Sequence, residues 1–144
     1  MIEWIILAAA VLPGLLIMAV SMWLLGWAGG WRAVARVYPA SGPPTGIRFG
    51  MQRCQFGWVG YNGCMTMHVS EEGLRIEVWW IFRFGHPTLL IPWSALHVHQ
   101  VIEKRWCRDI VLSVGAPELA RLRLPLKVIE AAEDFRARKE TQAS

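Results

Sequence analysis

The chain has 144 residues and a formal net charge of +4, and twelve of its fifteen basic residues are arginine. Setting aside a long apolar stretch near the N-terminus leaves about 110 residues, enough for one small domain with its own core. No contiguous basic helix or nucleic-acid-binding motif accompanies the positive charge, so nucleic acid is not an expected partner. The three cysteines cannot all pair within one chain, and reduced thiols are expected.

The apolar stretch runs from Trp4 to Leu25, and no charged side chain occurs between Glu3 and Arg32. A helix of this length rises roughly 33 Å and can cross a hydrocarbon core of about 30 Å, which predicts a transmembrane helix over residues 1–28. A cleaved signal peptide is the alternative. It is disfavoured because Glu3 stands where a basic n-region belongs, the apolar run is long, and no Ala-x-Ala cleavage site follows.

The flanking residues predict the orientation of this helix. No Lys or Arg precedes it, whereas Arg32 and Arg36 follow it, so the positive-inside rule places the N-terminus outside and the C-terminal domain in the cytoplasm. Trp27 and Trp31 stand where an interfacial aromatic belt is expected, and Trp4 suits the opposite interface. We therefore expect a single-pass protein of the inner (cytoplasmic) membrane, in contact with the bilayer through these five residues.

Small residues on one face of the predicted span suggest where a second helix would pack. Ala10, Gly14 and, two turns later, Ser21 lie roughly along one face. Small residues let helix backbones approach closely within a membrane, so this stripe is a candidate partner-binding surface. The alternative is that the stripe reflects the ordinary composition of a membrane helix.

Residues 29–46 are rich in Gly and Pro and are predicted to form a juxtamembrane neck. From Ile47 onward, apolar residues recur with a period of two, and turns separate the runs, which predicts seven short strands. From Pro125 the period becomes helical, which predicts an amphipathic helix over residues 125–138. A polar tail is expected over residues 139–144.

The clearest predicted strand runs from Leu74 to Phe84. Every even position in it is apolar and is expected to face the core. The odd face carries Trp79 and Ile81 between Arg75 and Arg83. Aromatic residues beside Arg are typical of interface anchors, so these four residues are predicted to bind a partner or touch the membrane. The alternative is that the sheet curls and Trp79 packs beneath the neck or beneath the Gly57–Gly63 loop.

Seven strands followed by one helix predict a mostly-β domain over residues 47–138. It would be an open barrel or sandwich of antiparallel strands capped by the C-terminal amphipathic helix. This order, together with Gly73-Leu-Arg-Ile-Glu-Val and Leu90-Ile-Pro-Trp-Ser-Ala-Leu96, resembles bacterial PH-like domains of the pleckstrin-homology superfold. The resemblance implies a binding or assembly module joined to a membrane span.

Phosphoinositide-binding members of that superfold carry clustered Lys and Arg on the first two strands. The same region of this chain offers Arg48 and Arg53, followed by Trp58, and has no further charge before Glu71. If the domain binds a lipid headgroup or a peptide, the resemblance implies that these three residues take part.

Side chains suited to metal or redox chemistry are few. A metal site has candidate ligands in His97 and His99, with His86 or Cys107, but their spacing matches no metal-binding motif. Redox thiols are available at Cys54 and Cys64, but the sequence places no activating base beside them. No catalytic motif stands out. We therefore expect no enzyme activity, no metal and no cofactor.

The leading hypothesis is a non-catalytic, membrane-anchored interaction module that serves as an accessory or scaffold subunit of a larger membrane protein complex. The anchor supplies a high effective concentration at the bilayer, so weak contacts suffice for docking. The alternative is a PH-like module that binds a lipid headgroup or a peptide. A metal or redox protein is the weaker alternative.

Overall fold

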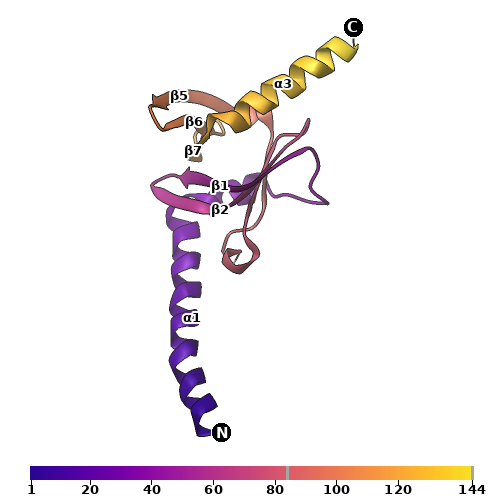
Figure 1. Cartoon of the computed structure of the whole chain (residues 1–144). Coiled ribbons are helices and arrows are strands. Elements are labelled where there is room, and N and C mark those ends of the chain that lie inside the picture. Colours follow the sequence, from indigo (N-terminus) through magenta and orange to yellow (C-terminus); the bar gives the residue numbers. More distant parts are fainter. Residues whose placement is uncertain (84, 144) are drawn as a thin grey trace.

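A single long helix carries a small β domain (Figure 1). The computed structural model describes residues 1–83 and 85–143, without the side chain of residue 139. Helix α1 spans Ile2–Ala28 and is followed by the short helix α2, Trp31–Val37. The apolar helix predicted over residues 1–28 is confirmed, and none of its most apolar 18-residue window is buried against the rest of the chain.

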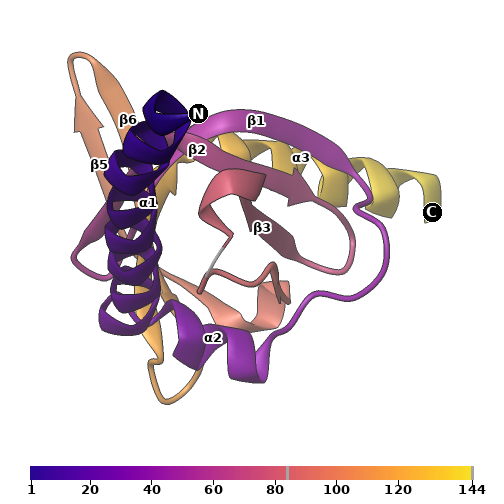
Figure 2. The same cartoon turned by 90° about the horizontal axis from the view of Figure 1, so that it is seen from below.

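The domain is built on one antiparallel sheet in the order β4-β3-β2-β1-β7-β6-β5. Figure 2, which looks along α1, shows this sheet bent into a half-barrel, and the predicted fold class is confirmed. The strands are β1 (Ile47–Phe56), β2 (Val59–Val69), β3 (Leu74–Val78), β4 (Leu89–Ile91), β5 (Leu96–Lys104), β6 (Cys107–Val114) and β7 (Ala120–Pro125).

The core lies inside the half-barrel and is closed by helix α3, Leu126–Ala143. Val128 and Ala132 of α3 are buried in it. The alternating residues that the period-two pattern assigned to the core on β2 and β3 are all buried, namely Met65, Met67, Val69, Leu74, Ile76 and Val78. α3 begins one residue later than predicted and continues to Ala143, through residues that were expected to form a polar tail.

Two segments differ from the sequence prediction. The predicted neck over residues 29–46 is not a simple linker, because α2 lies within it and buries Trp31 and Val34 in the core. Pro39 then forms an isolated bridge with Leu89 of β4, which ties the rest of this segment to the sheet edge.

The strand predicted from Leu74 to Phe84 ends at Val78. A 3₁₀ turn, η1 (Trp80–Phe82), follows it, and a second one, η2 (Trp93–Ala95), precedes β5. The backbone N–H of Trp79 donates to the Cys64 carbonyl at 2.8 Å and is the last link to β2. Trp80, expected in the core, is 68% exposed, while Phe84 lies outside the described residues.

Candidate functional site

Glycine contacts fix the C-terminal end of α1 against the domain. A Cβ on Gly26 would collide with the backbone of Gly85, which follows η1. A Cβ on Gly85 would in turn lie 2.9 Å from the Cα of Trp23, and Gly85 has a φ of +77° that favours glycine. The two backbones therefore touch directly, and the chain after η1 is held against the last two turns of α1.

A second glycine contact joins the α1–α2 junction to the β1–β2 turn. A Cβ on Gly57 would lie 2.8 Å from the Gly29 carbonyl oxygen, and Gly57 also has a positive φ of 61°. The Gly57 N–H donates to the Arg121 carbonyl at 2.7 Å, which links the turn to β7. We call the Gly26–Gly85 and Gly29–Gly57 contacts together the glycine clamp. The sequence reasoning missed it, because glycine content indicates loops without indicating which glycines meet.

A buried aromatic cluster lies directly behind the clamp. Trp31 packs against Phe56, Tyr61 and His86 with ring centroids 4.8, 5.8 and 5.1 Å away, and its indole N–H donates to the Pro87 carbonyl at 2.8 Å. Tyr61 Oη and His86 Nε2 share a buried hydrogen bond of 2.7 Å. Burial raises the pKa of the Tyr61 hydroxyl well above its ordinary value, so Tyr61 stays protonated.

Trp31 therefore does not belong to an interfacial belt. Its exposed fraction is 0%, whereas that of Trp27, four residues earlier at the end of α1, is 68%. The prediction for Trp31 is wrong because α2 turns this side chain into the domain core, where its N–H finds a carbonyl acceptor. Trp4, at the opposite end of α1, is exposed.

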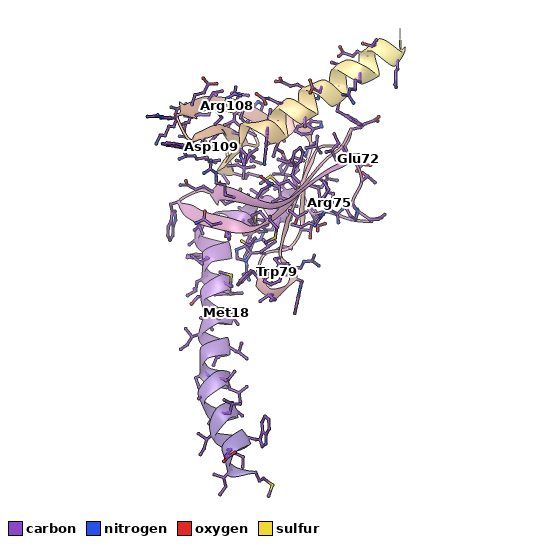
Figure 3. All side chains as sticks on the ribbon, in the orientation of Figure 1. Met18, Glu72, Arg75, Trp79, Arg108 and Asp109 are labelled. Atoms are coloured by element: carbon purple, nitrogen blue, oxygen red, sulfur yellow. The ribbon has the colours of Figure 1, made fainter. Side chains whose placement is uncertain are left out.

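Exposed tryptophans surround the domain end of α1. Trp27 lies on α1 itself, Trp58 lies on the β1–β2 turn beside the clamp, and Trp79 and Trp80 lie at η1. Figure 3 shows Trp79 beside α1, on the side of the sheet from which the helix extends. We call these four residues the tryptophan rim. Sequence reasoning assigned Trp27 to an interface, but did not recognise that Trp80 belongs beside it.

Basic side chains lie on the same end of the domain. The guanidinium of Arg32 stacks on the Trp23 ring with its Cζ 4.6 Å from the centroid, a cation–π contact. Arg32 and Arg36 also line a shallow hollow of about 350 Å³, together with Gly85 and Pro87. The two arginines chosen from the sequence therefore lie beside the end of α1.

The two arginines of the predicted odd face, Arg75 and Arg83, both lie beside the carboxylate of Glu77. Arg75 Nε donates to Glu77 Oε1 at 2.8 Å, and Arg83 Nη2 lies 3.8 Å from Glu77 Oε2. The Arg75 side chain is mostly buried, whereas that of Arg83 is half-exposed. Trp79 and Ile81 are partly exposed on the turn. Arg75 thus stabilises the local structure, and the accessible residues of the four are Trp79, Ile81 and Arg83.

The small-residue stripe on α1 faces open space. Ala10 and Gly14 are exposed, and a Cβ built on Gly14 meets no atom within 4 Å. The hydroxyl of Ser21 donates to the Ile17 carbonyl at 2.7 Å within the helix. In the described part of the chain, nothing packs on this face.

A basic groove lies at the other end of the domain. It has a volume of about 670 Å³ between the β5–β6 turn, the start of α3 and the middle of β1. Figure 3 shows Arg108 near the N-terminal end of α3, on the side of the domain opposite α1. The charged residues that line the groove are Arg53, Lys104, Arg105, Arg108, Lys127 and Glu130. We call this the distal groove; the sequence did not reveal it, because its residues come from four separate segments.

Ion pairs hold part of the distal groove in place. Arg53 Nη2 lies 2.9 Å from Oδ1 of the buried Asp109, whose Oδ2 accepts from Arg123. Arg108 bridges Glu103 and Glu130 at 3.2 and 3.5 Å. Lys104, Arg105 and Lys127 add further positive charge to the lining. Trp106 at the tip of the β5–β6 turn is 87% exposed, so the groove combines positive charge with an accessible aromatic ring.

The structure does not bring the three predicted headgroup residues together. Arg48 lies opposite His68 near the start of β1. Arg53 faces Asp109 at the distal groove, and Trp58 lies at the far end of the β1–β2 hairpin beside the glycine clamp. Arg53 shares the distal groove with other basic side chains, whereas Arg48 and Trp58 do not line it.

Side chains suited to metal or redox chemistry do not converge. Among the described residues, no three His, Cys, Asp or Glu side chains form a group that could hold a metal ion. Cys54 is buried, and burial raises the pKa of both the Cys54 and Cys64 thiols. A thiol that remains protonated at neutral pH is a poor nucleophile, so the local environment disfavours reactivity.

The chain was compared with protein-family models, curated proteins and solved structures, and none of them matches it.

Proposed function

We propose that this protein is a membrane-anchored, non-catalytic interaction module that acts as an accessory or scaffold subunit of a larger membrane protein complex. The observation that carries the proposal is the union of two features: a 27-residue apolar helix, unburied over its most apolar window, and a glycine clamp that joins it directly to a β domain. An apolar surface of that length favours a bilayer, and the clamp favours a domain presented at a fixed height above it.

The charge around the clamp supports a cytoplasmic domain. Arg32 and Arg36 follow α1 on α2, and α1 itself contains no Lys or Arg. Basic residues close to a span favour the cytoplasmic side, where the anionic leaflet attracts them. We therefore propose an inner-membrane protein with its N-terminus outside.

The sheet order and the closing helix favour a PH-like domain as the finer description of the fold. A meander from β1 to β4, a second from β5 to β7 and a C-terminal helix agree with what the resemblance of the Gly73 and Ile91-Pro-Trp-Ser segments implied. On this basis we propose a binding or assembly role, since the fold by itself specifies no chemistry.

Docking is proposed to use the small-residue stripe of α1 and the accessible Arg83 beside the membrane. The test is purification of the tagged full-length protein from its own membranes in a gentle detergent, followed by size-exclusion chromatography. We expect wild type to elute with fixed partners in constant ratio, and Gly14→Leu or Arg83→Glu to elute without them. Ala9→Leu is the matched control for Gly14→Leu, because it adds the same side chain about 140° around the helix.

Two outcomes would contradict the docking proposal. One is a wild-type protein that elutes with lipid and detergent alone. The other is an identical set of partners from Gly14→Leu, Arg83→Glu and the Ala9→Leu control, which would mean that neither proposed surface takes part.

A second candidate function, peptide binding, is favoured by the distal groove. The groove is basic, has Trp106 beside it and lies opposite α1, so headgroups of the membrane that holds α1 are out of its reach. The basic lining suits an acidic peptide, and the exposed Trp106 ring suits an apolar residue of that peptide. We expect a labelled Asp/Glu-rich peptide carrying one aromatic residue to bind the full-length protein in micelles, with binding weakened by salt.

A charge-reversal pair tests this candidate. Lys127→Glu, which lines the groove, is expected to lower peptide affinity at least tenfold, because it replaces an attraction with a repulsion. Arg121→Glu is the matched control, since Arg121 is paired with Glu118 outside the groove. Equal affinity of the two variants would remove the groove as the binding site, and binding of anionic vesicles in place of the peptide would identify a headgroup reader.

A further inference from the structure

The turn after β3 reaches below the end of α1. The missing Cβ of Gly85 would lie 2.9 Å from Trp23 Cα, so this part of the chain sits at the level of Trp23. Helix α1 ends at Ala28, five residues later, which places the contact about 7.5 Å before the helix end. Figure 1 shows the rose-coloured segment near residue 80 hanging beside α1, and Figure 3 places Trp79 there.

The tip of this turn exposes apolar side chains. Trp80 is 68% exposed, and Trp79 and Ile81 are 47% and 37% exposed, whereas Phe82 packs partly against the core. The ring centroids of Trp79 and Trp80 are 6.1 Å apart, and those of Trp79 and Phe82 are 6.0 Å apart, so Phe82 links the exposed pair to the domain. The exposed apolar side chains of the tip are therefore held in place by packing through Phe82 onto the core.

The backbone of the turn satisfies much of its own hydrogen bonding. The Trp79 N–H donates to Cys64 O at 2.8 Å, the Phe82 N–H donates to Trp79 O at 2.8 Å, and the Arg83 N–H donates to Trp80 O at 3.4 Å. Backbone groups that are already paired carry a smaller cost on leaving water, which is the condition for entering the boundary of a bilayer.

We propose that Trp79, Trp80 and Ile81 enter the bilayer interface beside α1 and form a second membrane contact of the domain. The inference rests on the proposed membrane anchorage. If α1 crosses the bilayer, its 27 residues span about 40 Å, which is the hydrocarbon core plus the headgroup regions. A turn held at the level of Trp23, about 7.5 Å before the end of that span, then lies at the edge of the hydrocarbon core next to the headgroups, the boundary at which Trp is favoured.

The surroundings of the turn identify the bilayer as its occupant. The chain at Gly85 lies against Trp23 and Gly26, so the exposed apolar tip lies beside the unburied helix α1, and the exposed Trp27 and Trp58 lie near the same helix end. The half-exposed Arg83 next to the tip stays available for the protein docking proposed above. This assignment takes Trp79 and Ile81 from the partner-binding surface predicted from sequence and gives them to lipid.

The test measures depth in the membrane with lipid-borne quenchers. An environment-sensitive fluorophore is attached to Trp80→Cys in the full-length protein, in a background with Cys64→Ser and Cys107→Ser, since Cys54 is buried. The protein is reconstituted in vesicles of phosphatidylcholine and phosphatidylglycerol carrying nitroxides near the headgroup or deep in the acyl chains. We expect the headgroup-level nitroxide to remove most of the fluorescence and the deep nitroxide much less.

Two further labelling sites keep the outcomes separate. Trp106→Cys is the matched control, an exposed Trp on the opposite end of the domain, and should escape both quenchers. Leu16→Cys, in the middle of α1, should respond to the deep quencher. If the label at Trp80→Cys is not quenched while the label at Leu16→Cys is, this inference alone is overturned, and the turn contacts protein instead. If the label at Leu16→Cys is not quenched by the deep nitroxide, the membrane anchorage itself is overturned.

Discussion

At the scale of single residues, two tryptophans four positions apart have opposite roles. Trp31 is buried in the aromatic cluster, and Trp27 is exposed on α1. We expect Trp31→Ala to lower the free energy of unfolding by about 3–5 kcal/mol, because it leaves a large cavity and removes the bond to Pro87. Trp27→Ala should change it by less than about 0.5 kcal/mol. Denaturant unfolding in micelles checks both, and equal losses would contradict the burial of Trp31.

His68 makes the stability of the domain depend on pH. Burial lowers the pKa of His68 below its ordinary 6.5, with Arg75 and Arg48 adding to the shift and Glu77 opposing it. Its buried Nδ1 has no hydrogen-bond partner among the residues that the structure describes. The folded state therefore favours neutral His68, so its contribution is complete above pH 6.5 and is lost as the pH falls through that value towards the lower folded pKa.

The corresponding measurement is thermal unfolding between about pH 7.5 and about pH 5 in wild type and His68→Gln. Wild type should lose more stability on acidification than the variant, which has no proton to bind at this position. His97→Gln, at an exposed position of β5, is the control for the loss of a histidine side chain as such. A slope shared by wild type and His68→Gln would contradict the prediction.

The period-two pattern predicted buried residues only where it coincided with pairing in the sheet. Met65, Met67, Leu74 and Ile76 alternate and are buried, because β2 and β3 pair along this stretch. The same alternation continues to Trp80, where no partner strand remains. Periodicity marks apolar side chains but does not show where strand pairing ends, which is why Trp80 was misplaced.

At the scale of elements, the helix–domain junction depends on Gly26. Replacing glycine by alanine within a helix gains up to about 1 kcal/mol of propensity, but a Cβ on Gly26 would meet the Gly85 backbone, which cannot yield as a side chain does. Overpacking costs about 1–3 kcal/mol, so Gly26→Ala should be destabilising overall.

Gly14→Ala is the control for this prediction, because the same helix leaves open space around Gly14. It should be neutral or slightly stabilising in the same thermal unfolding experiment in micelles. If Gly26→Ala unfolded at the temperature of Gly14→Ala, the junction would have to be looser than the contact between Gly26 and Gly85 indicates.

The elements themselves were largely predictable, while their junctions were not. Most strands carry an alternation bounded by turn residues, β4 is a short apolar run, and α3 carries a helical period, so local patterns indicate them. The residues that meet at the clamp, the rim and the distal groove are distant in sequence. Arg53 meets Asp109 because β7 lies between β1 and β6 in the strand order, and Gly29 meets Gly57 because the α1–α2 junction packs on the β1–β2 turn; no local pattern encodes either contact.

At the scale of the whole molecule, the two ends of the domain differ in character. The end at α1 carries the tryptophan rim with Arg32 and Arg36, and the far end carries the distal groove and the free edge of β5. One end suits lipid and the other suits a soluble acidic segment. A domain with two such ends needs a defined orientation, because tilting it would carry the groove towards the membrane.

The glycine clamp predicts that this orientation is fixed. Spin labels at Leu16→Cys on α1 and Val101→Cys on β5, in the Cys64→Ser, Cys107→Ser background, should give one narrow distance distribution in reconstituted full-length protein. Gly26→Leu should broaden it, because the helix can no longer seat against Gly85. A second pair within the domain, Ile47→Cys with Val101→Cys, should stay narrow in both proteins and thereby separate a loosened junction from an unfolded domain. If the distances between Leu16→Cys and Val101→Cys are broadly distributed while Gly26 is kept, the contacts at Gly26 and Gly29 do not fix the orientation of the domain relative to α1.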